Sequence, residues 1–81
     1  MNIYIGNLNY HVREDSLARV LEEYGEVSSV KIIKDRDTGR SKGFAFAEMP
    51  NDNEARNAIA GLNETDLDGR QMILKKALPR K

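Results

Sequence analysis

The sequence has no cysteine, no tryptophan and one histidine among its 81 residues. Without cysteine, the chain cannot form a disulfide framework, a thiolate metal site or a cysteine nucleophile. One histidine is too few for a His-rich metal cluster, so we expect no metal and no cofactor. No apolar run reaches the about 20 residues that span a bilayer, and the N-terminus lacks the features of a signal peptide. We therefore expect a cytoplasmic protein with no membrane partner.

Net charge of one sign is also lacking, because 13 basic and 13 acidic residues cancel. Neutrality by itself argues against nucleic-acid binding, since domains that bind nucleic acid are often strongly basic. The charges are nevertheless segregated along the chain. Residues 27–50 and 70–81 hold ten basic and three acidic residues, whereas residues 11–26 and 51–69 hold three basic and ten acidic ones.

The hydrophobic period alternates between strand and helix character. Two stripes with the spacing i, i+3, i+4, i+7 predict amphipathic helices, and they consist of Leu17, Val20, Leu21 and Tyr24, and of Ala55, Ala58, Ile59 and Leu62. Gly25 should end the first helix, and Asn51 should cap the second. The expected strands cover residues 3–5, 27–34, 43–49 and 71–76, with a hairpin loop at 35–41 and a turn at Asp68–Gly69.

The expected order is strand, helix, strand, strand, helix, strand. Because each helix has a single apolar stripe, both should cover the same face of one sheet. Right-handed crossovers then give a four-stranded antiparallel sheet with the first and third strands in the middle. The predicted fold is an α+β ferredoxin-like sandwich that forms one domain over residues 1–81. The other sheet face should be open to solvent, although this fold alone does not determine a function.

The third expected strand carries the strongest functional pattern. Side chains alternate in a strand, so Lys42, Phe44, Phe46 and Glu48 share one face, and the intervening small residues share the other. Charged residues are rarely buried, so the face with both phenylalanines should be the open one. In the first strand, Tyr4 should join this face if the flanking isoleucines enter the core. Exposed aromatic residues beside a lysine suit a stacked base and its phosphate.

The segment from Lys42 to Met49 resembles the octamer motif of the RNA-recognition-motif family. Its first five residues match, and the departures at Ala47 and Met49 fall on the inward face. Residues 3–8 resemble the hexamer motif of the same family, so the resemblance covers essentially the whole chain. The chain is also similar to the small single-domain members of the family found in bacteria.

The resemblance implies that the chain binds single-stranded RNA. In this family the aromatic residues of the two motifs stack bases, which here are Tyr4, Phe44 and Phe46. Lys42 would pair with a phosphate, and Glu48 would contact a base edge. Further contacts are expected from the basic residues Lys31, Arg40, Lys75 and Arg80.

Several interpretations stay open at this point. Single-stranded DNA could replace RNA, because stacking and phosphate pairing serve both. A protein-protein interaction module on the same fold is the alternative function, whereas an enzyme is disfavoured because no constellation of catalytic residues converges. Gly6 is expected to give a ligand access to the backbone, and Tyr10 to pack near the first helix. Asn7 is expected either to contact a base or to form a turn, and the protein to be a monomer.

Overall fold

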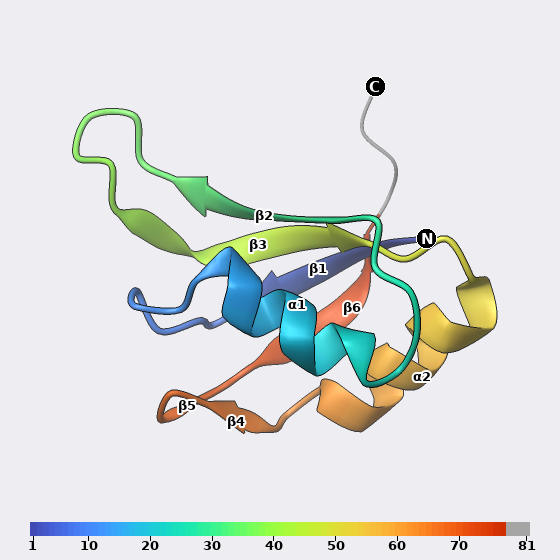
Figure 1. Cartoon of the computed structure of the whole chain (residues 1–81). Coiled ribbons are helices and arrows are strands. Elements are labelled where there is room, and N and C mark those ends of the chain that lie inside the picture. Colours follow the sequence, from blue (N-terminus) through green and yellow to red (C-terminus); the bar gives the residue numbers. More distant parts are fainter. Residues whose placement is uncertain (78–81) are drawn as a thin grey trace.

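Four strands form one antiparallel sheet in the computed structural model (Figure 1), which describes residues 1–77 apart from the side chain of Ser41. Their order across the sheet is β2 (Ser29–Lys34), β3 (Ser41–Glu48), β1 (Asn2–Gly6) and β6 (Ile73–Ala77). The first and third strands therefore occupy the middle, as the sequence predicts. The ferredoxin-like α+β architecture is confirmed.

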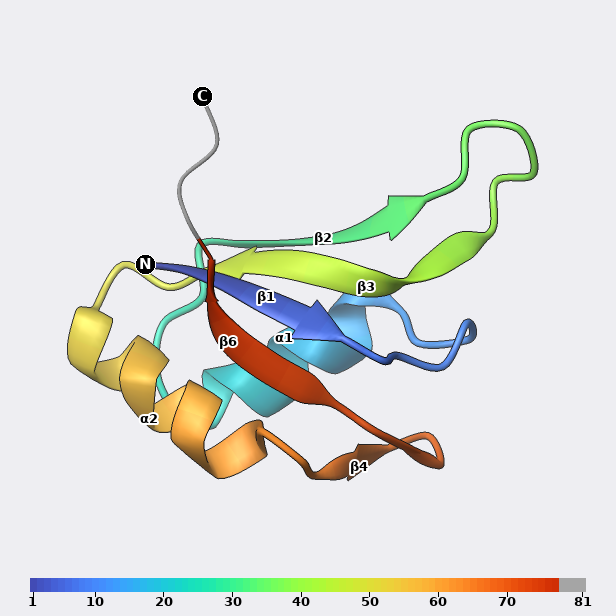
Figure 2. The same cartoon turned by 180° about the vertical axis from the view of Figure 1, so that it is seen from behind.

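Both helices lie on the same side of the sheet. Figure 2, which views the molecule from behind, shows the strands in front of α1 (Glu14–Glu22) and α2 (Asp52–Leu62). Acidic side chains occupy the first turn of each helix, where their negative charges interact favourably with the positive end of the helix dipole. The predicted cap of α2 is confirmed, because the Glu54 backbone N–H donates to Asn51 Oδ1 at 3.0 Å. Neither helix within residues 1–77 has the length and apolar character that crossing a membrane requires.

The core fills the space between the helices and one sheet face. Its members are at most 9% exposed and come from both layers, and they include Ile3, Ile5, Leu17, Leu21, Ala45, Ala47, Ala55 and Ala58. The alanines of β3 and α2 are small, which lets the helix backbone approach the sheet closely. The predicted inward face of the third strand is thus confirmed.

The last strand begins later than the sequence predicts. Residues 66–67 and 70–71 form a separate two-stranded hairpin, β4 (Asp66–Leu67) and β5 (Arg70–Gln71). Asp68 and Gly69 both have positive φ, 51° and 82°, as a tight two-residue hairpin turn requires. Met72 then bonds to Thr65 rather than to β1, so the long ladder with β1 starts only at Ile73.

Candidate functional site

The open sheet face presents a row of four side chains that crosses all four strands. Lys31 lies opposite Phe46, Phe46 opposite Tyr4, and Tyr4 opposite Lys75 in the strand registers. Both lysines are exposed, and both rings are partly exposed. Because side chains alternate along each strand, the residues on either side of Tyr4 and Phe46 point into the core. The row therefore places two cations at the two ends of an aromatic centre.

Tyr4, Phe44 and Phe46 form a triangular aromatic cluster. The ring centroids of Tyr4 lie 6.0 Å from Phe44 and 5.8 Å from Phe46, and the two phenylalanine centroids are 6.1 Å apart. The planes of Tyr4 and Phe44 are inclined by only 30°, whereas the two phenylalanines are nearly perpendicular at 89°. The rings hold one another by edge and stacked contacts while all three stay partly open to solvent. The cluster offers an apolar π surface on the side of the sheet that neither α1 nor α2 covers.

Gly6 makes room for the Tyr4 ring, not for a ligand. A Cβ built on Gly6 would lie 2.5 Å from the Tyr4 hydroxyl oxygen and 2.7 Å from ring carbon Cε2. The tyrosine ring therefore lies along its own strand, with its hydroxyl end over the glycine two residues later. The expectation that Gly6 exposes its backbone is wrong, because the ring buries it. Gly6 instead sets the orientation of one member of the aromatic cluster.

Charged groups surround the aromatic cluster. The Lys75 ammonium lies 5.2 Å from the Tyr4 ring centroid, a distance at which a cation is attracted to the ring face. Glu48 is exposed two register pairs further along the sheet, opposite Asn2 and Ser29. A carboxylate at this point can accept hydrogen bonds from an exocyclic amino group of a base.

Lys42 and Arg40 lie towards the hairpin end of β3 rather than within the cluster. The register shifts between Ile32 and Lys34, and Gly43 has φ +85°, so the regular alternation is interrupted between Phe44 and Lys42. Lys42 is exposed and lies near enough to Asp35 to contribute to that group's lowered pKa. The sequence prediction that Lys42 shares one regular face with Phe44 neglected this irregularity.

The loop between β2 and β3 is organised by Asp35. Its carboxylate accepts the backbone N–H groups of Asp37 at 2.8 Å and Thr38 at 3.3 Å. These hydrogen bonds are the main reason that the pKa of Asp35 is lowered, and the positive charge of Lys42 adds to them. The Asp35 backbone N–H also donates to the Arg40 carbonyl at 2.7 Å, which closes the loop. Arg40 is one of the residues predicted to contact RNA.

Three further residues lie differently from what the sequence predicts or were not considered as contacts. They are Asn7, Ile73 and Tyr10. Asn7 has φ 59° and links β1 to the β4–β5 hairpin, since its side chain donates to the Gln71 carbonyl and accepts from Arg70, both at 2.7 Å. Ile73 is 39% exposed opposite Gly6, on the open face, where its spacing of two from Lys75 could have placed it. Tyr10 is 66% exposed, so the expectation that it packs near the first helix is wrong. Arg80 lies outside the described residues.

Comparisons with known proteins agree with this geometry. The family description that matches is the RNA recognition motif, over residues 3–73. The candidate RNA-binding protein RbpB of Nostoc sp. is 48% identical over 80 residues, which cover 99% of this chain and 78% of the relative. RNA binding protein PG1, for which a crystal structure is known, is 53% identical in sequence to this chain. Its structure superimposes with a TM-score of 0.96 and covers 100% of this chain and 98% of the other. The structure of the Rna15 RNA recognition motif with bound RNA (GU) is 29% identical, with a TM-score of 0.83 over 94% of this chain and 81% of the other. Family match, identity and fold together make this chain a member of the RNA recognition motif family.

Proposed function

We propose that the chain binds single-stranded RNA across the open face of its sheet. The observation that carries the proposal is the aromatic cluster, three rings whose centroids lie within 6.1 Å of one another on a face that neither α1 nor α2 covers. Apolar surface in this position adds little to the core and marks a binding site. The names of RbpB and of RNA binding protein PG1, and the RNA bound to the Rna15 domain, support RNA as the ligand.

In the proposed mechanism, a short unpaired strand crosses the sheet and two or three bases stack on the aromatic cluster. Lys31 and Lys75, at the two ends of the row, pair with phosphates on either side of the stacked bases. Glu48 accepts a hydrogen bond from a base edge. Arg40 and Lys42 extend the positive surface towards the β2–β3 loop, and a contact from Arg80 stays a prediction. Stacking tolerates any base, so the aromatic cluster should contribute affinity without selecting a particular RNA sequence.

The proposal describes a binding protein rather than an enzyme. The open sheet face offers the π surfaces of the aromatic cluster, the ammonium groups of Lys31 and Lys75 and the carboxylate of Glu48, which suit reversible stacking and pairing. Single-stranded DNA presents the same bases and phosphates, so its affinity relative to RNA is one outcome of the test. A single domain over residues 1–81, a monomeric state and a cytoplasmic location stay predictions, which limited proteolysis, light scattering and cell fractionation would check.

The test is fluorescence anisotropy with labelled random-sequence RNA and the double variant Phe44→Ala/Phe46→Ala. Stacking contributes about 1–3 kcal/mol per base, so losing two platforms should weaken binding at least about thirtyfold. The control is Phe44→Tyr/Phe46→Tyr, which keeps both rings and should keep most of the affinity. Unchanged affinity in a folded alanine variant would contradict the proposal and move attention to protein partners of the two helices. Matched DNA pools in the same assay decide whether the 2′-hydroxyl contributes.

A further inference from the structure

Tyr10 is an exposed aromatic residue that the proposed site does not use. Only two large hydrophobic residues in the described chain are exposed, Ile73 on the open face and Tyr10, at 66%. The Tyr10 hydroxyl cannot explain the exposure of a whole ring, because tyrosine normally buries the body of its ring and leaves only its polar end wet. A solvent-exposed ring on a small domain is a candidate contact for a ligand.

The Tyr10 ring lies next to Gly43, at the hairpin end of β3. A Cβ built on Gly43 would be 3.5 Å from Tyr10 Cε1, so the ring touches the β3 backbone at the residue immediately before Phe44. Ile32, a core residue on the helix side of the sheet, lines the same groove as Tyr10, so the ring lies towards the helix side. An RNA strand that leaves the aromatic cluster would therefore turn around the hairpin end of β3 to reach the ring.

Hydrogen bonds hold the backbone of the loop between β1 and α1 in place and keep Tyr10 at the surface. The Leu8 backbone N–H donates to the Gly43 carbonyl at 2.8 Å. The Asn9 side chain accepts from the His11 backbone N–H at 2.9 Å and donates to the Asp68 carbonyl at 3.0 Å. These bonds join the loop to β3 through Leu8 and to the β4–β5 hairpin through Asn9, and the His11 bond closes a turn around Tyr10. A pinned aromatic ring loses little conformational freedom when it binds.

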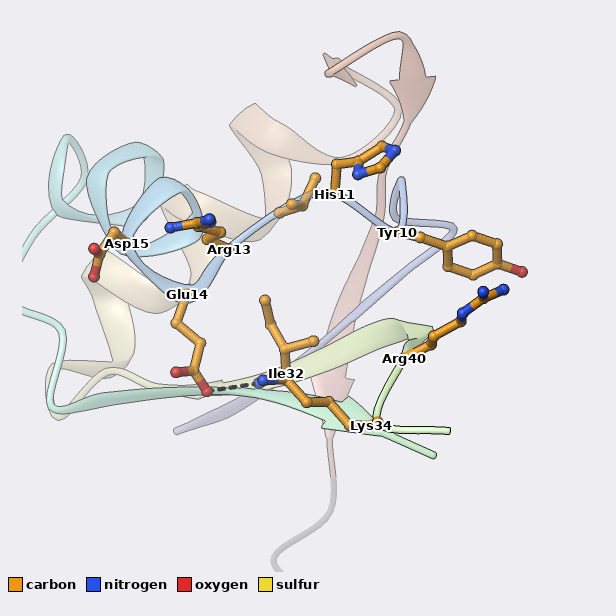
Figure 3. Close-up of a pocket in the computed structure, with 10 residues that line it drawn as sticks. Tyr10, His11, Arg13, Glu14, Asp15, Ile32, Lys34 and Arg40 are labelled. Atoms are coloured by element: carbon orange, nitrogen blue, oxygen red, sulfur yellow. Dashed lines mark hydrogen bonds between the residues drawn. The ribbon is translucent and has the colours of Figure 1, made fainter. Parts of the chain in front are cut away.

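Basic side chains accompany the ring. Tyr10 lines an open groove of about 930 Å³ together with Lys34 and Arg40, and Figure 3 shows Tyr10 and Arg40 at one end of it. Neither Lys34 nor Arg40 forms an ion pair with another described residue, so both charges are available. Glu14 and Asp15 line the groove at the helix end in Figure 3, where the Glu14 carboxylate accepts the Ile32 backbone N–H at 3.1 Å. The cationic end of the groove is therefore the end at the β2–β3 loop.

We infer that Tyr10 stacks a further base of the same RNA strand and that Arg40 and Lys34 pair with its phosphate. The inference rests on the proposed function, since the strand reaches Tyr10 from the base stacked on Phe44. It extends the binding site around the hairpin end of β3 and adds one nucleotide to the length of RNA that the domain covers. A base next to Tyr10 also lies beside an arginine plane, which stacks on bases as well as pairing with phosphates.

The test measures affinity for random-sequence RNA pools that lengthen by one nucleotide at a time, with the intact chain and with Tyr10→Ala. For the intact chain, affinity should rise in steps, and one step of about tenfold should vanish in the alanine variant. Shorter pools that fill only the aromatic cluster should bind both proteins equally. Tyr10→Phe keeps the ring and should keep the step. Because Tyr10 is exposed, the alanine variant should unfold at the same temperature as the intact chain.

A second readout reports on the ring directly. The chain has no tryptophan, so Tyr10→Trp introduces a single indole whose fluorescence a stacked base should quench. Quenching by the longer pools but not by the shorter ones is the expected result. If Phe44→Ala/Phe46→Ala abolishes binding while Tyr10→Ala matches the intact chain at every length, the inference about Tyr10 is overturned and the proposed function stands. If both sets of variants bind as the intact chain does, both are overturned.

Discussion

The two faces of β3 invert the usual distribution of apolar volume. On the covered face, Ala45 and Ala47 are 0% and 3% exposed, yet they are among the smallest apolar side chains. On the open face, Phe44 and Phe46 carry far more apolar area and remain partly wet. Burial of large side chains is what stabilises a small domain, so a chain selected for stability alone would place its phenylalanines inside. The inversion indicates that the open face is built for a ligand.

Along β3, residues that stabilise the fold thus alternate with residues that face the proposed ligand. Alanines on the covered face let α1 and α2 pack closely, while rings on the open face lie on a backbone that the core keeps rigid. Substitutions on the two faces should consequently have different readouts. Core changes should lower the free energy of unfolding, and open-face changes should lower affinity for RNA.

The largest stability effect is expected from the core directly beneath the cluster. Ile5 is 1% exposed, and Ile5→Ala should reduce the free energy of unfolding by about 2–5 kcal/mol, through lost burial and the cavity left behind. Phe46→Ala should cost less than half as much, because its ring is already partly in water. Urea denaturation of both variants measures the difference. Equal destabilisation would mean that the aromatic cluster is part of the core, and the comparison between the two faces would fail.

A smaller effect on binding is expected from Gly6→Ala. The added methyl group must displace the Tyr4 ring, which lies over the glycine, so the cluster loses its geometry and RNA affinity should fall by up to about tenfold. Stability should change little, since the atoms in the way belong to the outer end of a flexible side chain. The control is a double-mutant cycle with Tyr4→Ala. Gly6→Ala should have no further effect once the tyrosine ring is gone, and a full additional loss would show that Gly6 acts by another route.

The smallest effect compares two neighbouring lysines of β6. Lys75 faces the open side opposite Tyr4, whereas Lys76 lies opposite the core residue Ile3 and points to the other side. Both substitutions to alanine remove one exposed charge, but only Lys75→Ala should weaken RNA binding several-fold. The slope of log affinity against log salt should also fall by about 0.7 for Lys75→Ala alone. Equal losses from both variants would indicate long-range attraction without a phosphate contact at Lys75.

The periodic parts of the molecule could be predicted from the sequence because each repeats a local physical rule. The alternation in residues 43–49 fixed which side chains meet the helices, and Asn51 and Asp68–Gly69 marked a cap and a turn by their side chains or backbone preferences. Three of the predicted site residues, Tyr4, Phe44 and Phe46, lie together because a single register relation connects β1 and β3.

The irregular parts could not be predicted in the same way. The orientation of the Tyr4 ring over Gly6 is a rotamer choice, and the position of Tyr10 depends on loop bonds from Leu8 and Asn9 to distant segments. The positive φ of Gly43 interrupts the alternation that the sequence pattern assumes for Lys42. The ring orientation and the backbone angle are local choices and the loop position depends on distant contacts, and periodicity encodes none of the three.

The most direct test is an NMR titration of the labelled protein with short random-sequence RNA, followed at each backbone amide. The account predicts shifts concentrated along β1 and β3, at Tyr4, Phe44 and Phe46, with smaller ones at Lys31 and Lys75. The amide signals of α1 and α2 should not shift. A well-dispersed spectrum whose shifts fall on the helices and leave the aromatic cluster unchanged would contradict the central claim that the open sheet face is the RNA-binding site.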